Sequence, residues 1–442
     1  MTARESEIIE LLQKEVKPAL GCTEPIAVAL AVAKAMEIIE EKNSSDDPQW
    51  RFRAGYNLKV EVSGNILKNG MGVGIPGTGM VGLHIAAALG AVCGKSAYGL
   101  EVLHDLDERS IAKAKELVES KSVIVGVADT GHKLYVKASV EVTGDHCASA
   151  VIEDDHDRII ETCYDGTVLS CGRSTEAVVM TEQKNTLDYN LTVKEIFEFA
   201  KTVSYDDIQF ILESKTLNLA LAEEGMKGNY GLKVGYFISH SANREVFGGD
   251  FLSYAMSMTA AASDARMAGC TLAAMSNSGS GNQGISTTLP MAVFAEKMDI
   301  PEEKLLRAEF MAMLMIMYMK KHVGRLSPVC GAMVAGTGSA AGMTYMLGGS
   351  FEQISGAVQN MMGSVAGIFC DGAKGGCAVK VAACAGEAVY AAMYAMDGSM
   401  IGVSDGINST KAEDTAKNLA KLSHEALADV DMKVIEIMQT KK

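Results

Sequence analysis

Three long stretches without a charged side chain constrain the fold most strongly. They span residues 267–295, 326–351 and 353–370. Gly, Ser, Ala, Thr and Asn dominate them, whereas a transmembrane helix is rich in Leu, Ile and Phe. The whole chain has 44 Gly and 27 Met, and methionine fills irregular gaps between closely packed helices. We therefore predict tightly packed buried helices and loops, not membrane spans and not a β-sandwich or barrel.

Length and charge exclude several classes of protein. A chain of 442 residues is long enough for two or three domains, or for one large domain with an insertion. The net charge of −15 argues against nucleic-acid and anionic-lipid partners. The first ten residues are polar and acidic, which is not typical of a secretory signal. The ten cysteines are therefore expected as free thiols or metal thiolates in a reducing cytoplasm.

The pattern of apolar residues changes along the chain. Helical periodicity predicts helices near each end, and period-two alternation predicts strands between them. We predict an α+β protein in which a ferredoxin-like α/β module, residues 51–69 and 105–189, is inserted into a mostly helical domain, residues 1–50, 70–104 and 190–442. The expected helices are 5–17, 25–41, 105–120, 307–320 and 411–440, and the expected strands are 58–62, 122–127, 133–142, 146–152 and 158–164.

Two motifs suggest other cofactors. Residues 72–77, 77–82 and 279–284 each match GxGxxG, and Glu101 follows the second at the spacing of a ribose-binding acid. However, Pro76 and its neighbouring glycines make a poor central strand, so we favour Gly-rich turns. Lys374 could be the Schiff-base lysine of a pyridoxal phosphate enzyme, with 278–284 as the phosphate cup, or an exposed loop cation.

Three cysteines lie in small-residue loops. Cys330, Cys370 and Cys377 each have Gly or Ala within two residues, which lets backbone N–H groups approach a cluster sulfur. Cys370 and Cys377 are seven residues apart, and the Gly-rich chain between them can turn so that both thiolates reach one metal centre. From these residues alone, two interpretations remain open: the three cysteines are ligands of a cluster, or they are small buried side chains.

Longer motifs resemble the L-cysteine desulfidase family from Lys17 to about Lys380. The C-terminal half is also similar to the alpha chain of iron–sulfur L-serine dehydratases. The matching segments are GCTEP at 21–25, NILKNG at 65–70, PGTGMVG at 76–82, ASDAR at 262–266, SNSGSGNQG at 276–284 and FCDGA at 369–373.

This resemblance implies a [4Fe–4S] cluster on the helical domain, with Cys330, Cys370 and Cys377 as ligands and one iron without a protein thiolate. Such an iron can act as a Lewis acid, whereas an electron-transfer cluster has four cysteine ligands. The implied reaction eliminates hydrogen sulfide from L-cysteine to give pyruvate and ammonia. The alternatives are the same reaction on L-serine and a non-catalytic iron–sulfur sensor. Assembly of the chain into a homo-oligomer is a further possibility.

The resemblance also implies that Cys22 is the base that takes the Cα proton. Cys22 precedes a helix expected at Pro25, and a helix N-terminus favours thiolate. Glu24 is the rival base or a helix-start acid. The loop 276–284 is expected to cradle the substrate carboxylate through hydroxyls, amides and backbone N–H groups. The expected substrate-binding residues are Asn65, Lys68, Asn69, Ser276, Asn277, Ser278, Gly279 and Asn282.

Overall fold

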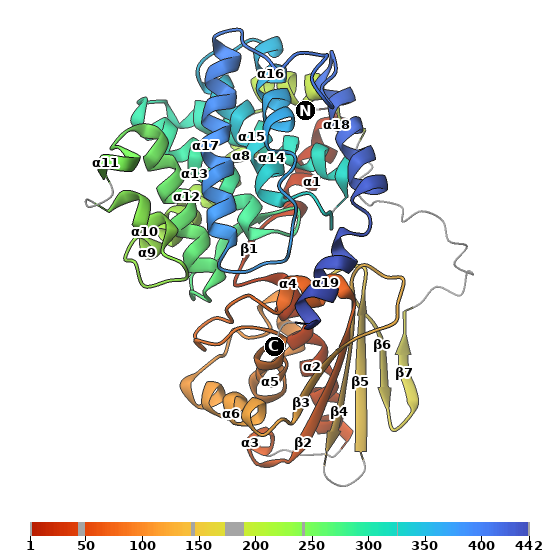
Figure 1. Ribbon diagram of the computed structural model, residues 1–442. Helices are drawn as coiled ribbons and strands as arrows, with labels where there is room; N and C mark the ends of the chain where they lie inside the picture. The colour runs from red at the N-terminus through yellow and green to blue at the C-terminus, as the bar shows by residue number, and fades with distance from the viewer. Residues whose placement is uncertain are drawn as a thin grey trace.

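The computed structural model describes residues 2–42, 49–142, 146–172, 190–240, 244–324 and 326–440. It has two lobes, one built on a β-sheet and the other on helices (Figure 1). Helices predominate in the described residues, and one mixed six-stranded sheet contains most of the strands. The prediction of a mostly helical α+β protein is thus confirmed.

The sheet lobe contains the strands that alternation predicted. Its strand order is β3-β2-β4-β5-β6-β7, in which β2 and β3 run parallel and the other neighbours are antiparallel. Side chains alternate between buried and accessible along β2 and β4, so one face of the sheet is a core face. The bounds are β2 Tyr56–Val62, β3 Val123–Val127, β4 Tyr135–Val142, β5 His146–Glu153, β6 Ile159–Tyr164 and β7 Thr167–Cys171.

Helices α2 (Thr23–Lys42) and α5 (Leu83–Cys93) cover this core face, and α6 (Glu108–Glu119) packs on α5. The backbones of α2 and α5 approach closely, because a Cβ on Gly90 would lie 2.4 Å from the Ala29 carbonyl oxygen. The expected division placed 1–50 and 70–104 with the helical domain, whereas α2 and α5 share their core with the sheet. Both helices are apolar almost all round, so their pattern does not indicate which core they join.

The helical lobe contains the uncharged stretches as buried helices. A Cβ on Gly338 of α15 would lie 2.6 Å from the Ala312 carbonyl oxygen of α14, so small residues set the spacing between these helices. The lobe comprises α7 Val193–Thr202, α8 Tyr205–Ile208, α9 Leu212–Gly225, α10 Val234–Ser239, α11 Arg244–Phe247, α12 Phe251–Met267, α13 Gly281–Lys297, α14 Glu302–Val323, α15 Gly331–Met346, α16 Phe351–Val365, α17 Cys377–Met396 and α18 Ala412–Lys421.

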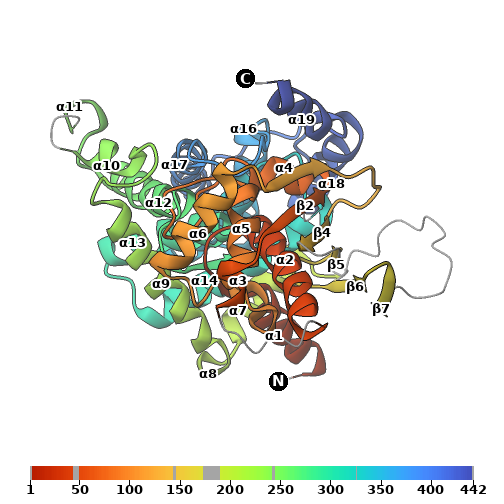
Figure 2. The ribbon, with the colours of Figure 1, turned by 90° about the horizontal axis from the view of Figure 1, so that it is seen from below.

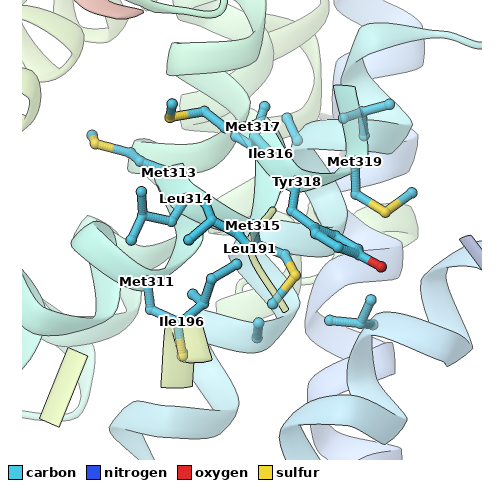
Figure 3. Close-up of a cluster of buried hydrophobic side chains, with 14 of the residues drawn as sticks. Leu191, Ile196, Met311, Met313, Leu314, Met315, Ile316, Met317, Tyr318 and Met319 are labelled. Carbon is cyan, nitrogen blue, oxygen red and sulfur yellow. The ribbon is translucent and has the colours of Figure 1, made fainter. Parts of the chain in front are cut away.

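Methionines fill the centre of this lobe. Met311, Met313, Met315, Met317 and Met319 alternate along α14, and all five side chains are buried (Figure 3). Alternate positions of a helix point in different directions, so α14 is enclosed by apolar contacts on all sides. Flexible thioether side chains suit the irregular gaps left by the surrounding Gly-rich helices.

The chain connects the two lobes at both of its ends. Helix α1 (Ala3–Glu15) packs in the helical lobe, and β1 (Val16–Ala19) pairs with β8 (Ala274–Asn277) before the chain enters the sheet lobe. At the other end, α19 (Val430–Thr440) lies next to α4 (Gly64–Gly70), as the view from below also shows (Figure 2). The helix expected at 411–440 is therefore two helices, α18 and α19, separated by a π-helical turn and a short bend.

Among the described residues, α17 is the one helix long and apolar enough to cross a membrane by length and composition. It packs against α12, α15 and α16, and 56% of its most apolar window is buried. The core helix of a globular protein has the same length and composition, so α17 is weak evidence for a membrane span.

Candidate active site

A cavity of about 140 Å³ lies where the two lobes meet. The sheet lobe contributes the start of α2 and the helix α4, and the helical lobe contributes the loops that precede α13, α15 and α17. Residues far apart in the sequence therefore face one space. Of the predicted site residues, those in its lining are Cys22, Asn65, Lys68, Asn69, Ser278, Gly279, Asn282, Cys330, Cys370 and Cys377.

Backbone hydrogen bonds tie the loops of Cys330 and Cys370 together. The Cys330 N–H donates to the Ile368 carbonyl at 2.9 Å, and the Cys370 N–H donates to the Pro328 carbonyl at 2.6 Å. Cys330 is the N-cap of α15, and Cys377 is the first residue of α17. All three thiols therefore lie on loops or helix starts that open onto the same cavity.

The loop from Cys370 to Cys377 is shaped by its contact with α4. Gly372 has a φ of +97°, and a Cβ there would lie 2.1 Å from the Lys68 carbonyl oxygen, so no other residue fits without a shift of the backbone. Asp371 forms ion pairs with Lys374 and Lys380. Burial raises the pKa of Asp371, but the hydrogen bonds from the two lysines outweigh it and lower the pKa to about 2.

The cavity has a positive electrostatic character. Helices α2, α13, α15 and α17 all begin at its wall, and each helix N-terminus carries a partial positive charge. Lys68, Arg266, Lys320 and Lys380 also line it, whereas Glu24 is the one acidic side chain among the described lining residues. The arrangement suits anionic ligands, such as thiolates, a carboxylate or a negatively charged cluster.

The pKa of Cys22 differs from the sequence-based expectation. Cys22 directly precedes α2, as predicted, but its burial raises the pKa to about 12, and an interaction with Arg266 only partly lowers it. Loss of solvation therefore outweighs the effect of the helix N-terminus, on which the expectation of a thiolate was based. Burial also raises the pKa of Cys330, to about 11.

The three cysteines that line the cavity are of the donor type that iron–sulfur clusters use. Among the described residues, no three His, Cys, Asp or Glu side chains are grouped closely enough to hold one ion. A single ion requires all its donors within about 2.3 Å of one point. A cluster distributes its thiolates over several irons, so its ligands can lie farther apart than those of a single ion. Cys330, Cys370 and Cys377, with helix starts around them, are the residues that would hold such a group.

Two predicted substrate contacts are not at the cavity. Ser276 and Asn277 end β8, and their side chains face the protein interior. Ser276 Oγ donates to the Lys17 carbonyl at 2.6 Å, and Asn277 Nδ2 donates to the Met313 carbonyl at 3.4 Å. Strand pairing and these hydrogen bonds use both side chains to hold the loop, which leaves Ser278 and Gly279 to face the cavity.

The alternative cofactor motifs take other roles in the structure. Gly72 and Gly74 make only isolated bridges, and the segment up to α5 is turns, not a strand of a dinucleotide fold. The segment 279–284 joins β8 to α13, where the Ser280 side chain caps the helix. Lys374 is outside the described lining of the cavity and pairs with Asp371.

Sequence reasoning missed several lining residues. Arg266 lies in a motif that the resemblance used, but it was given no role there. Lys320 is a lysine buried at the end of the methionine-rich helix α14, and a buried charge in such a helix is an unusual feature that could have identified it. Gln283 also lines the cavity; it lies in the motif 276–284 but was given no role there, and no local pattern indicates His156, the other lining residue.

Comparison with known proteins places the chain in a family. Residues 97–436 match the family model described as serine dehydratase alpha chain. The chain is also 42% identical to a "UPF0597 protein" of Phocaeicola vulgatus over 99% of this chain and 98% of that protein. Similar proteins of the same name occur in Shewanella pealeana, at 42% identity over 98% of both chains, and in Oleidesulfovibrio alaskensis, at 43% identity over 99% of this chain and 98% of that protein.

Dehydratases are lyases, and the serine dehydratase alpha-chain family is generally an iron–sulfur family. The match covers helices α7 to α18 of the helical lobe and all three cluster-candidate cysteines. The chain is a member of the serine dehydratase alpha-chain family and of its UPF0597 group.

Proposed function

We propose that this protein is a cytoplasmic L-cysteine desulfidase that converts L-cysteine to pyruvate, ammonia and hydrogen sulfide. Its cofactor is a [4Fe–4S] cluster held by Cys330, Cys370 and Cys377, and pyridoxal phosphate takes no part. The observation that carries the proposal is the cavity that these three cysteines share with Cys22 and with several basic side chains.

A bound [4Fe–4S] cluster supplies Lewis acidity at an iron without a protein thiolate, which suits acceptance of a leaving sulfide. The protein's own residues fix where this happens. The N-termini of α15 and α17 stabilise the negative charge of the Cys330 and Cys377 thiolates. Lys380, which also lines the cavity, interacts electrostatically with both cysteines. Elimination gives an aminoacrylate, which tautomerises and hydrolyses to pyruvate and ammonia.

Cys22 accepts the Cα proton in this proposal. It precedes α2 of the sheet lobe and packs with Val73 and Met267, and Cys377 packs against the same small cluster. The Arg266 guanidinium interacts electrostatically with the Cys22 side chain and favours its thiolate form. Glu24, held by a 3.3 Å hydrogen bond from Thr23 Oγ1, is the other base within the cavity.

L-serine is the second candidate substrate, because the matching family model is that of the serine dehydratase alpha chain. Thiolate is the softer ligand for iron, so we expect L-cysteine to be preferred. The test is anaerobic reconstitution with iron and sulfide, followed by pyruvate and sulfide assays with each amino acid at the same concentration. Faster turnover of L-serine would reverse the assignment, and no turnover of either would favour a non-catalytic sensor.

A further inference from the structure

Arg266 and Gln283 are two buried side chains of the cavity whose polar groups are only partly used by the protein. Arg266 is 5% exposed and Gln283 is 1% exposed, and both line the cavity. Arg266 Nε and Gln283 Oε1 are buried atoms without a hydrogen-bond partner in the described structure. A buried polar atom without a partner is costly, so each is suited to a ligand group.

The charge of Arg266 is not balanced by a carboxylate. Among the described residues, no Asp or Glu lies within ion-pair distance of its guanidinium. It donates to the Gly21 carbonyl at 2.9 Å and to Asn282 Oδ1 at 3.3 Å, and it interacts electrostatically with Cys22. By contrast, Lys68 and Lys380 are paired with Asp431 and Asp371. Of these three cations, Arg266 is the one that still requires an anion.

The chain is built closely around this guanidinium. A Cβ on Gly281 would lie 2.3 Å from Arg266 Nε, so the lack of a side chain there leaves space for the arginine. Gly281 begins α13, whose N-terminus adds a partial positive charge. A guanidinium presents five N–H donors in a planar fork that matches a carboxylate. The two hydrogen bonds to oxygen atoms of the protein fix the plane of this fork and leave further donors available.

Gln283 presents an acceptor to the cavity near the start of α15. Its Nε2 donates to the Asn277 carbonyl at 3.1 Å, which fixes the orientation of the amide. Its Oε1 lies 3.4 Å from the position of a Cβ on Gly331, next to Cys330. An oxygen acceptor held in this way suits an ammonium group.

We propose that Arg266 binds the α-carboxylate of the amino-acid substrate and that Gln283 Oε1 accepts a hydrogen bond from its α-ammonium group. This assignment rests on the proposed function for the identity of the substrate. Because Arg266 donates to the carbonyl of Gly21, the residue before Cys22, a carboxylate at Arg266 places the Cα proton near the Cys22 sulfur. The side chain of the substrate then extends towards the three cluster cysteines.

Two truncated ligands separate the two contacts. 3-Mercaptopropionate lacks the ammonium group of L-cysteine, and cysteamine lacks its carboxylate. Their binding to the anaerobically reconstituted protein is measured by calorimetry, with iron content determined before and after. We expect Arg266→Met to weaken 3-mercaptopropionate binding roughly 10- to 100-fold, as expected for loss of charge-assisted hydrogen bonds, and to leave cysteamine binding within about twofold. Gln283→Leu should weaken cysteamine binding and spare 3-mercaptopropionate.

Arg158→Met is the matched control, because Arg158 is a surface arginine that pairs only with Asp154 in the described ion pairs. Arg266→Lys retains the charge but not the fork, and it should weaken 3-mercaptopropionate about tenfold if Arg266→Met does not fold. Equal weakening of both ligands by Arg266→Met, or normal 3-mercaptopropionate binding to Arg266→Lys, would overturn the assignment. If the binding pattern holds but L-cysteine is not turned over, the head-group site stands and the proposed function fails.

Discussion

At the scale of single residues, the burial of Cys22 opposes the thiolate form that its proposed role as a base requires. Burial keeps its thiol protonated, and Arg266 is the group that favours the thiolate. We expect Cys22→Ala to retain iron and ligand binding but to lower sulfide release roughly 100- to 10,000-fold, the usual contribution of a general base. Glu24→Gln is the comparison variant, because Glu24 lines the same cavity. If Glu24→Gln abolishes turnover while Cys22→Ala does not, the two roles are exchanged.

Glu309 is a second buried residue with a measurable consequence. It is 1% exposed on α14, and burial raises its pKa from 4.5 to about 8. The folded protein therefore holds this proton up to about pH 8, whereas the unfolded chain loses it near pH 4.5. Stability must fall as pH rises through this window. We expect Glu309→Gln to be more stable than the parent by about 2–4 kcal/mol at pH 8, and by much less at pH 4.5.

Urea unfolding at several pH values measures the effect of Glu309→Gln. Glu303→Gln, an exposed position on the same helix, is the control. An equal effect of Glu309→Gln at pH 4.5 and pH 8 would show that Glu309 is ionised in the folded protein.

At the scale of elements, the C-terminal helix α19 connects the lobes through one buried ion pair. Lys68 Nζ on α4 lies 2.6 Å from Asp431 Oδ1 on α19, and the two side chains are 2% and 19% exposed. Removal of one partner leaves a buried charge uncompensated. We expect Asp431→Asn to lower the free energy of unfolding by about 1–3 kcal/mol, less than for a fully buried pair because Asp431 is partly solvated.

Glu436→Gln is the control for Asp431→Asn on the same helix, because its pair with Lys433 is exposed and should contribute less than about 1 kcal/mol. Chemical denaturation of both variants gives the comparison. Equal effects of the two substitutions would mean that α19 does not hold the lobes together through Lys68.

Alternation and helical periodicity predicted most of the elements but not how they end or turn. The strands β4 and β5 were predicted because one face of each is buried. The break between α18 and α19 contains no proline, so the sequence predicted one continuous helix at 411–440. For the loop 276–284, composition indicated polar groups but not their direction. In the folded chain, hydrogen bonds turn Ser276 and Asn277 towards the protein interior, whereas Ser278 faces the cavity.

At the scale of the whole molecule, the candidate site depends on how the two lobes meet. Cys22 and Cys377 belong to different lobes and are more than 350 residues apart, yet they pack together. No local sequence pattern predicts this contact. For the cysteines, the motif resemblance was what predicted a shared site. Arg266 and Gln283 lie in matching motifs but were given no role, and Lys320 lies outside the motifs, so the place of all three in the cavity emerged only from the fold.

The central claim is that Cys330, Cys370 and Cys377 hold a [4Fe–4S] cluster with one iron open to L-cysteine. Mössbauer spectroscopy of the protein reconstituted anaerobically with ⁵⁷Fe tests it most directly, with and without L-cysteine. Serine variants of the three cysteines and the control Cys147→Ser, a cysteine outside the described lining, accompany it.

We predict the spectrum of a [4Fe–4S] cluster, a change at a single iron site when L-cysteine is added, loss of iron in each of the three variants, and normal iron content in Cys147→Ser. An unchanged spectrum with L-cysteine, or full iron content in any of the three variants, would contradict the account.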